Sequence, residues 1–178
     1  VIERQSGALH FVVNGDIQAD TETSGQIHLR LLGHLPPLLH PDPKQGLVVC
    51  LGTGITAGSL LRHPIEQLDI VELSPAVPGI QHFFTQWNYD LLNDSRVKIF
   101  QEDGRNFLFR SNKKYDVVTT DPLDPNDAGM TLLYSKEYFE LIREHLNDGG
   151  VVSQWLPPPP SSTYGAEYYR ILLRTFIE

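Results

Sequence analysis

Four acidic side chains follow apolar runs of the sequence, at points where a carboxylate could do chemistry. Glu72 ends one such run, Asp103 follows the next, and Asp121 and Asp124 follow a third. In open parallel sheets, ligands bind beyond the carboxyl ends of the strands, so these acids are predicted to face one site. Each acid taken alone also fits a solvated surface position, but four acids at successive strand ends favour a binding site.

The segment Asp121–Pro125 reads Asp-Pro-Leu-Asp-Pro. Pro122 and Pro125 fix their own φ and bias the aspartate before each of them towards an extended conformation. Two carboxylates on a stiff loop suit a cationic amine, whose pKa is about 10. The amine must lose a proton before its nitrogen can attack carbon, and a carboxylate can accept that proton. The alternative interpretation is a plain Asp-Pro turn.

A glycine loop precedes these acids in the chain. Leu47–Leu51 is a short apolar run that predicts a buried parallel strand, and Gly52 and Gly54 follow it before a helical stretch. Such a loop lets backbone N–H groups and a helix N-terminus approach a ligand. Glu72, about 20 residues beyond the glycines, is placed to accept both hydroxyls of a ribose. Ala57 is an allowed substitute for the third glycine of a dinucleotide fingerprint, which leaves a nicotinamide cofactor open at this point.

The composition is that of an ordinary soluble domain. The 178 residues are 40% hydrophobic and 20% charged, which allows one domain with a substantial core. The net charge of −8, without any basic run, makes nucleic acid an unfavourable partner and suits cationic small molecules. Acidity that serves solubility alone is an equally good interpretation.

The single cysteine, Cys50, lies in the predicted core strand and suits a reducing compartment, so we expect a cytoplasmic location. No apolar stretch reaches transmembrane length and no signal peptide is visible. The chain begins with Val1, so we expect it to be an excised or incomplete piece, and fusion of the full-length protein to a membrane segment is an open alternative.

Residues 1–25 predict a small β-hairpin element, and residues 26–45 a helix and a Pro-rich linker. The hairpin consists of Ala8–Val13, a tight turn at Asn14-Gly15, and a return strand from Ile17. A short helix is predicted over Ile27–Leu32, ended by Gly33 and by the prolines at 36 and 37.

Residues 46–178 predict alternating strands and helices. Further strands are predicted at Leu68–Leu73, Val97–Gln101, Tyr115–Thr120 and Val151–Trp155. Helices are predicted at Thr56–Arg62, from a cap at Ser74, at Gly104–Arg110, at Ser135–Leu146 with a stop at Gly149-Gly150, and at Ala166–Ile177, with a rigid loop at Pro157–Pro160. This order predicts an α/β fold with a parallel sheet and helices on both faces.

With these motifs in hand, the chain resembles spermidine synthases, the polyamine aminopropyltransferases, and most closely the synthase-like domain of transporter-fused bacterial proteins. The resemblance covers nearly the whole chain. The matching stretches are 14–18, the glycine loop, 71–73, 102–104, 115–118, 121–125, 133–139, 149–150 and 154–157.

The resemblance implies a class I methyltransferase-like Rossmann domain with a small N-terminal β element. It implies no tightly bound cofactor and no metal, with S-adenosylmethionine or its decarboxylated form as co-substrate. The implied roles are a general base at Asp121, amine binding at Asp124 and His28, and donor binding at Gln18, Gly52, Thr53, Gly54, Glu72, Asp103 and Gly104.

The chain departs from the family pattern at several points. Thr53 stands where the family has an acid that contacts the donor's amino group, and the family's Tyr-His pair is reduced to Ile27-His28 or His28-Leu29. The family's Gly-Pro after the aspartates becomes Asp127-Ala128. The family also has a Gln that would precede Val1 and two strands that would follow Glu178. An open sheet edge is then expected, through which the chain would self-associate, with a homodimer as one form.

The favoured hypothesis is aminopropyl transfer from decarboxylated S-adenosylmethionine to an amine such as putrescine. The first alternative is methyl transfer from S-adenosylmethionine to an unknown acceptor. The second is a domain that binds an adenosyl ligand without catalysis. Thr53 is expected to weaken the preference for the decarboxylated donor, because its hydroxyl carries no charge.

Overall fold

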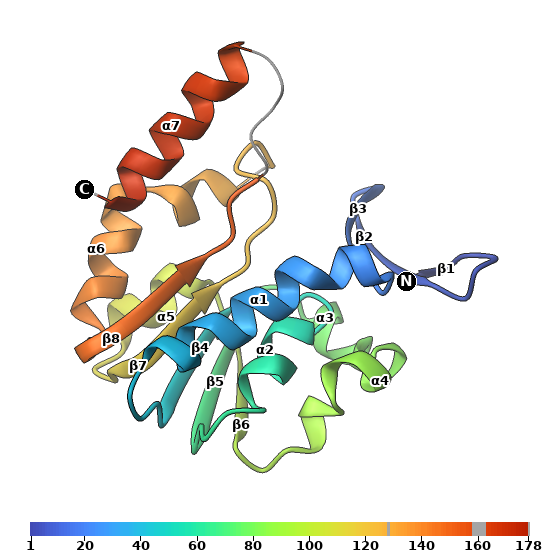
Figure 1. The fold of residues 1–178 in the computed structure, drawn as a ribbon, viewed down its shortest axis with the longest axis horizontal. Coiled ribbons are helices and arrows are strands. Elements are labelled where there is room, and N and C mark those ends of the chain that lie inside the picture. Colours follow the sequence, from blue (N-terminus) through green and yellow to red (C-terminus); the bar gives the residue numbers. More distant parts are fainter. Residues whose placement is uncertain (128, 158–162, 178) are drawn as a thin grey trace.

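The α/β fold class predicted from the sequence is confirmed. The computed structural model describes residues 1–127, 129–157 and 163–177. It contains a three-stranded antiparallel sheet at the N-terminus and a five-stranded parallel sheet with helices on both faces (Figure 1).

The N-terminal sheet has the order β1-β2-β3 and consists of β1 (Ile2–Glu3), β2 (Leu9–Val13) and β3 (Asp16–Asp20). Asn14 and Gly15 join β2 to β3 with φ values of 53° and 95°, the positive values that a tight hairpin turn needs. Phe11 of β2 is buried in the same apolar cluster as residues of the main sheet, so the small sheet packs against the main one.

The main sheet has the order β6-β5-β4-β7-β8, and every neighbouring pair is parallel. Its strands are β4 (Gln45–Val49), β5 (Gln67–Glu72), β6 (Val97–Gln101), β7 (Tyr115–Thr120) and β8 (Leu146–Gln154). The chain adds strands on one side of β4 and then returns to add β7 and β8 on the other. The crevice at this change of direction, at the carboxyl ends of β4 and β7, is where such sheets bind ligands.

Helices cover both faces of the main sheet. The α-helices are α1 (Thr23–Leu39), α2 (Ile55–Leu60), α3 (Ala76–Gly79), α4 (Thr85–Asn88), α5 (Gly104–Arg110), α6 (Lys136–Glu144) and α7 (Thr163–Ile177). Short 3₁₀ segments are η1 (Gln81–Phe83), η2 (Leu91–Asn93) and η3 (Met130–Tyr134). Along β4, Val48 joins the apolar cluster that includes α2, whereas Leu47 and Val49 join the cluster that includes α5 and α6.

The short helix predicted over Ile27–Leu32 is wrong in length, because α1 runs from Thr23 to Leu39 with two prolines inside it. Pro36 has no N–H to donate to the Leu32 carbonyl, which removes one helical hydrogen bond. In its place the Leu32 oxygen accepts from the hydroxyls of Ser153 and Thr119, at 3.4 and 3.5 Å. The sheet therefore replaces a hydrogen bond that the helix loses.

Other boundaries also differ from the prediction, by one or two residues at most strands and by more at the elements below. The helix α6 ends at Glu144, and Gly149-Gly150 lies inside β8 instead of stopping the helix. After Glu72, the expected single helix is broken into α3, η1, α4 and η2, and the N-cap of α3 is Pro75, not Ser74 as predicted. Tyr89 and Asp90, between α4 and η2, take positive φ, which interrupts the helical backbone there. The loop predicted at Pro157–Pro160 lies, from residue 158 on, outside the described residues.

Within the described residues, no helix has the length and hydropathy that crossing a membrane requires. The strand β8 is at one edge of the described sheet. Self-association through that edge stays a prediction.

Close packing of α1 on α2 gives a first test of the fold. A Cβ at Gly33 would lie 2.3 Å from the Thr56 carbonyl oxygen and 2.6 Å from Ser59 Cβ. We expect Gly33→Ala to lower the free energy of unfolding by about 1–3 kcal/mol, the range of overpacked core sites. Urea denaturation measures this, and Gly15→Ala, at a turn where nothing lies within 4 Å, separates steric clash from backbone strain. An unchanged stability in Gly33→Ala would contradict the packing described here.

Candidate active site

Two adjoining clefts open at the carboxyl ends of the central strands. The first, here the glycine-loop cleft, has a volume of about 470 Å³, and its lining includes Cys50, Gly52 and Glu72. The second, here the aspartate cleft, has a volume of about 370 Å³, and its lining includes Asp121 and Asp124. Leu123 belongs to both linings, so ligands in the two clefts would meet beside it.

Glu72, the last residue of β5, is held rigidly at the glycine-loop cleft. It is 9% exposed, and its two carboxylate oxygens accept hydrogen bonds from the backbone N–H groups of Leu51 and Ser74, each at 2.8 Å. A carboxylate offers about four acceptor positions, so both oxygens retain one for a ligand hydroxyl. This arrangement suits a vicinal diol such as that of a ribose.

Asp121 follows β7 and occupies the aspartate cleft. Its backbone N–H donates to the Val49 carbonyl at 3.1 Å, and its Oδ2 accepts from the Thr56 hydroxyl at 3.0 Å. Burial raises the pKa of Asp121 to about 6, although the Thr56 hydrogen bond works in the opposite direction. A carboxylate with a pKa near the working pH is suited to act as a general base.

The aspartate cleft gathers residues from distant parts of the chain. Gln18 from β3, His28 from α1 and Asp124 all line it with Asp121. The family resemblance assigns Asp121, Asp124 and His28 to the amine side but Gln18 to the donor, so Gln18 lines the opposite cleft from Glu72, and these roles stay predictions. Asp16 and Asp127 add two further carboxyl groups. Among the described residues that line either cleft there is no Lys or Arg, so the surroundings favour a cation.

Cys50 lies close to three of the acids at the strand ends. Burial, and then the carboxylates of Glu72, Asp121 and Asp103, raise the pKa of its thiol well above the ordinary value. Carboxylates at the ends of three different strands therefore lie near enough to Cys50 to act on its thiol, while the gathering of the four acids in one binding site stays a prediction. The backbone of Cys50 has a φ of 73°, a conformation that side chains rarely adopt, and such strain is often found at functional sites.

Most of the chain matches a known protein family. The family model of the spermine/spermidine synthase domain matches residues 26–156. The chain belongs to the spermine/spermidine synthase family.

Curated relatives of this family are longer than the chain. A polyamine aminopropyltransferase of Archaeoglobus fulgidus is 30% identical over 173 residues, which is 97% of this chain but 61% of the relative. Putrescine N-methyltransferase 2 of Nicotiana tabacum is 33% identical over 142 residues, 79% of this chain and 40% of the relative. The chain thus spans about half the length of these relatives.

Solved spermidine synthase structures share the fold. The enzyme from Thermotoga maritima gives a TM-score of 0.78 at 21% identity, covering 93% of this chain and 55% of that one. A spermidine synthase in complex with the transition state analogue AdoDATO gives 0.76 at 20% identity, covering 93% and 54%.

Four residues that the family resemblance assigns to the donor line neither cleft. Thr53 is 2% exposed, and Gly54 is the N-cap of α2 in the left-handed conformation. Asp103 caps α5 by accepting from the N–H groups of Arg105 and Asn106, and Gly104 packs against Val49. Their roles as donor-binding residues of this synthase family member stay predictions.

Asp103 can be tested for its two roles separately. We expect Asp103→Ser to keep the helix cap and lose only the charge, whereas Asp103→Ala loses both and costs about 1 kcal/mol of stability. If Asp103 also binds the donor, both variants weaken binding of methylthioadenosine in calorimetry, while only Asp103→Ala melts at lower temperature. Unchanged affinity in both variants would limit Asp103 to capping.

Sequence reasoning did not select several residues at the site. Leu123 and Met130 line the glycine-loop cleft, Cys50 was assigned only to the core, and Thr56 was not recognised as the partner of Asp121. The proline spacing around Leu123 was the one available signal, since it stiffens the loop that carries this side chain. The other three depend on contacts between distant parts of the chain.

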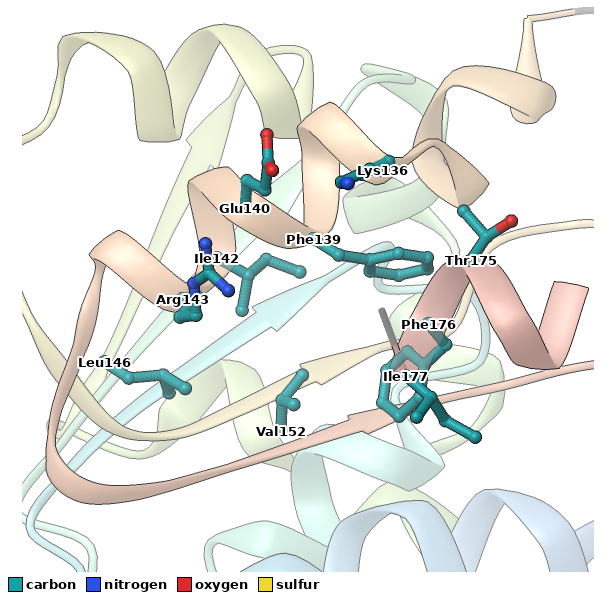
Figure 2. A pocket seen from close by; sticks show the side chains of 10 residues that line it. All are labelled: Lys136, Phe139, Glu140, Ile142, Arg143, Leu146, Val152, Thr175, Phe176 and Ile177. Atoms are coloured by element: carbon teal, nitrogen blue, oxygen red, sulfur yellow. The ribbon is translucent and has the colours of Figure 1, made fainter.

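A third pocket lies away from these residues. Its volume is about 250 Å³. Figure 2 shows Phe139 and Ile142 of α6, Val152 of β8 and Phe176 of α7 among the side chains that line it. Its lining is mainly apolar, and Lys136, Glu140 and Arg143 also contribute to it. None of the predicted site residues contributes to this pocket, so it belongs to a different region of the synthase domain.

Proposed function

We propose that this chain carries the transfer site for an aminopropyl group, which moves from decarboxylated S-adenosylmethionine to an amine of a polyamine such as putrescine. The observation that carries the proposal is the pair of adjoining clefts, one with a diol-binding carboxylate and the other with several carboxyl groups and no cationic Lys or Arg among its described lining residues. The fold and the family of the chain support the same assignment.

In this proposal each cleft holds one reactant. The adenosyl donor lies in the glycine-loop cleft, with its ribose hydroxyls on Glu72. The amine lies in the aspartate cleft, where Asp124 and the neighbouring carboxylates bind its positive charge. Because the clefts meet beside Leu123, the attacking nitrogen and the donor carbon are brought together there, and this alignment supplies most of the rate enhancement.

The chemical step is a displacement at carbon. Asp121 accepts a proton from the ammonium group, and the nitrogen lone pair forms a bond to the propyl carbon next to the sulfonium. The carbon–sulfur bond breaks, its electron pair stays on sulfur, and methylthioadenosine leaves as a neutral thioether. The proton on Asp121 then passes to solvent.

The charge of the clefts bears on the choice of donor. S-adenosylmethionine carries a carboxylate that its decarboxylated form lacks, and the acidic clefts repel it. Thr53 is buried and uncharged, so it offers no ion pair to the donor's amino group. We therefore expect a preference for the decarboxylated donor that rests on repulsion alone and is weaker than a direct ion pair would give.

Methyl transfer is a second candidate, favoured by the similarity to a putrescine N-methyltransferase. The same clefts would hold the same amine, and only the carbon that is attacked would differ. The acceptor site is thus common to both candidates.

One assay separates the candidates. The protein is incubated with putrescine and either donor, and spermidine, N-methylputrescine and methylthioadenosine are followed by mass spectrometry. We expect spermidine and methylthioadenosine with the decarboxylated donor. N-methylputrescine with S-adenosylmethionine would favour methyl transfer, and ligand binding without any product would favour a non-catalytic domain.

A further inference from the structure

Thr56 makes the one side-chain hydrogen bond to Asp121 among the described residues. It is the second residue of α2, 3% exposed, and its Oγ1 donates to Asp121 Oδ2 at 3.0 Å. No described residue donates to the other oxygen, Oδ1, so that oxygen retains its full acceptor capacity. A carboxylate fixed at one oxygen keeps the orientation of the second.

The position of Thr56 is set by the glycine loop that precedes it. The Gln81 amide donates to the Gly52 carbonyl at 2.8 Å, and the Asn88 amide donates to the Thr53 carbonyl at 3.3 Å and to the Gln81 side-chain oxygen at 3.0 Å. Gln81 and Asn88 are each 1% exposed. These buried amides hold the loop and therefore the start of α2.

We propose that Thr56 is a positioning residue, whose hydroxyl fixes the Asp121 carboxylate and ties the base of the aspartate cleft to the loop of the glycine-loop cleft. The inference rests on the proposed function, because it presumes that Asp121 accepts the proton of the amine. The glycine loop would then also orient the carboxylate that accepts the proton of the amine.

Several other titratable groups lie around Asp121, while its pKa shift has burial and the Thr56 hydrogen bond as its causes. Asp16 of β3 and His28 of α1 line the same cleft, as do Asp124 and Asp127 of the loop that follows Asp121. Cys50 after β4 and Tyr134 of η3 interact electrostatically with Asp121. None of them donates a hydrogen bond to it, so removal of the Thr56 hydroxyl is expected to raise the pKa of Asp121, because the ionised form loses its donor.

The test compares Thr56→Val, which keeps the shape and loses the hydroxyl, with Thr56→Ser, which keeps the hydroxyl. With the decarboxylated donor and putrescine, we expect Thr56→Val to lower kcat about 10- to 100-fold, the range for a hydrogen bond to a charged group. The acidic limb of its pH profile should move to higher pH. Thr56→Ser should restore the wild-type pH profile, and the affinity for methylthioadenosine should stay within about twofold, the level of indirect effects.

Ser59→Ala is the matched control, since Ser59 is a buried residue of the same helix whose hydroxyl has no hydrogen-bond partner in the described structure. It should leave the pH profile unchanged. A wild-type pH profile in Thr56→Val would overturn the proposal. It would also be overturned if kcat fell equally in Thr56→Val and Thr56→Ser and both variants melted at a lower temperature. If the wild-type protein transfers no group, the proposed function has failed. The hydrogen bond can still be tested, because NMR titration of the Asp121 carboxyl resonance in wild type and Thr56→Val compares the two pKa values directly.

Discussion

Replacement of Asp121 by Asn is expected to slow aminopropyl transfer by about 10²- to 10⁴-fold, the usual contribution of a general base. Asn has nearly the same shape and can still accept from the Thr56 hydroxyl, but it cannot take a proton. Initial rates with the decarboxylated donor and putrescine measure the loss. Spermidine formation at an undiminished rate would remove Asp121 from the base role.

The pH profile gives this prediction a second readout. Because the pKa of Asp121 is raised to about 6, activity should rise as the pH passes through this value and the carboxylate forms. A further rise towards about pH 10 is expected as the amine deprotonates. Asp121→Asn should lose the first rise and keep the second.

A folding control accompanies the same variant. Since burial raises the pKa of Asp121 in the folded state, the unfolded state binds fewer protons between about pH 4 and pH 6, and stability falls as the pH rises through that window. Above this window the buried carboxylate opposes folding. Asp121→Asn should therefore melt at the same temperature or higher at pH 7.5, which separates lost chemistry from lost structure.

Replacement of Glu72 by Gln is expected to raise the dissociation constant of methylthioadenosine about 100-fold, since the ribose loses a charged acceptor. The free energy of unfolding should fall by about 1–3 kcal/mol as well. Both carboxylate oxygens accept backbone N–H groups, from Leu51 and Ser74, and the amide of Gln can replace only one of these acceptors.

Calorimetry and urea denaturation measure the two effects of Glu72→Gln. Glu102→Gln is the matched control, because Glu102 follows the neighbouring strand β6 but lines neither cleft. Its affinity for methylthioadenosine should equal that of the wild type. An equal loss of affinity in both variants would show that the overall negative charge of this region, and not a contact at Glu72, controls binding.

The sequence was sufficient for elements whose residues determine their own conformation. The predicted bounds of β6, α5 and β7 agree with the structure, because their apolar patterns and the Asp103 cap are local. The prediction failed for α1 because prolines were taken to end the helix. The hydroxyls of Thr119 and Ser153, which accommodate Pro36 by binding the Leu32 carbonyl, are distant in sequence.

The candidate site shows the same division between local and distant information. Strand ends are readable from apolar runs, so Glu72, Asp121 and Asp124 could be placed at clefts from the sequence. Which side of a loop reaches a cleft is not readable, and Thr53 and Asp103, which the family resemblance assigns to the donor, line neither cleft. The pairing of Thr56 with Asp121 spans 65 residues and leaves no sequence pattern.

The location of Cys50 provides a natural probe of ligand binding in the glycine-loop cleft. It is the only cysteine in the 178 residues, it is partly accessible, and it lines the glycine-loop cleft. Thiol-reactive dyes should label it slowly near neutral pH, because burial and the nearby carboxylates keep the thiol protonated. An occupied cleft would shield it further, so the labelling rate of the unmodified protein would read out donor binding directly, without any engineered probe.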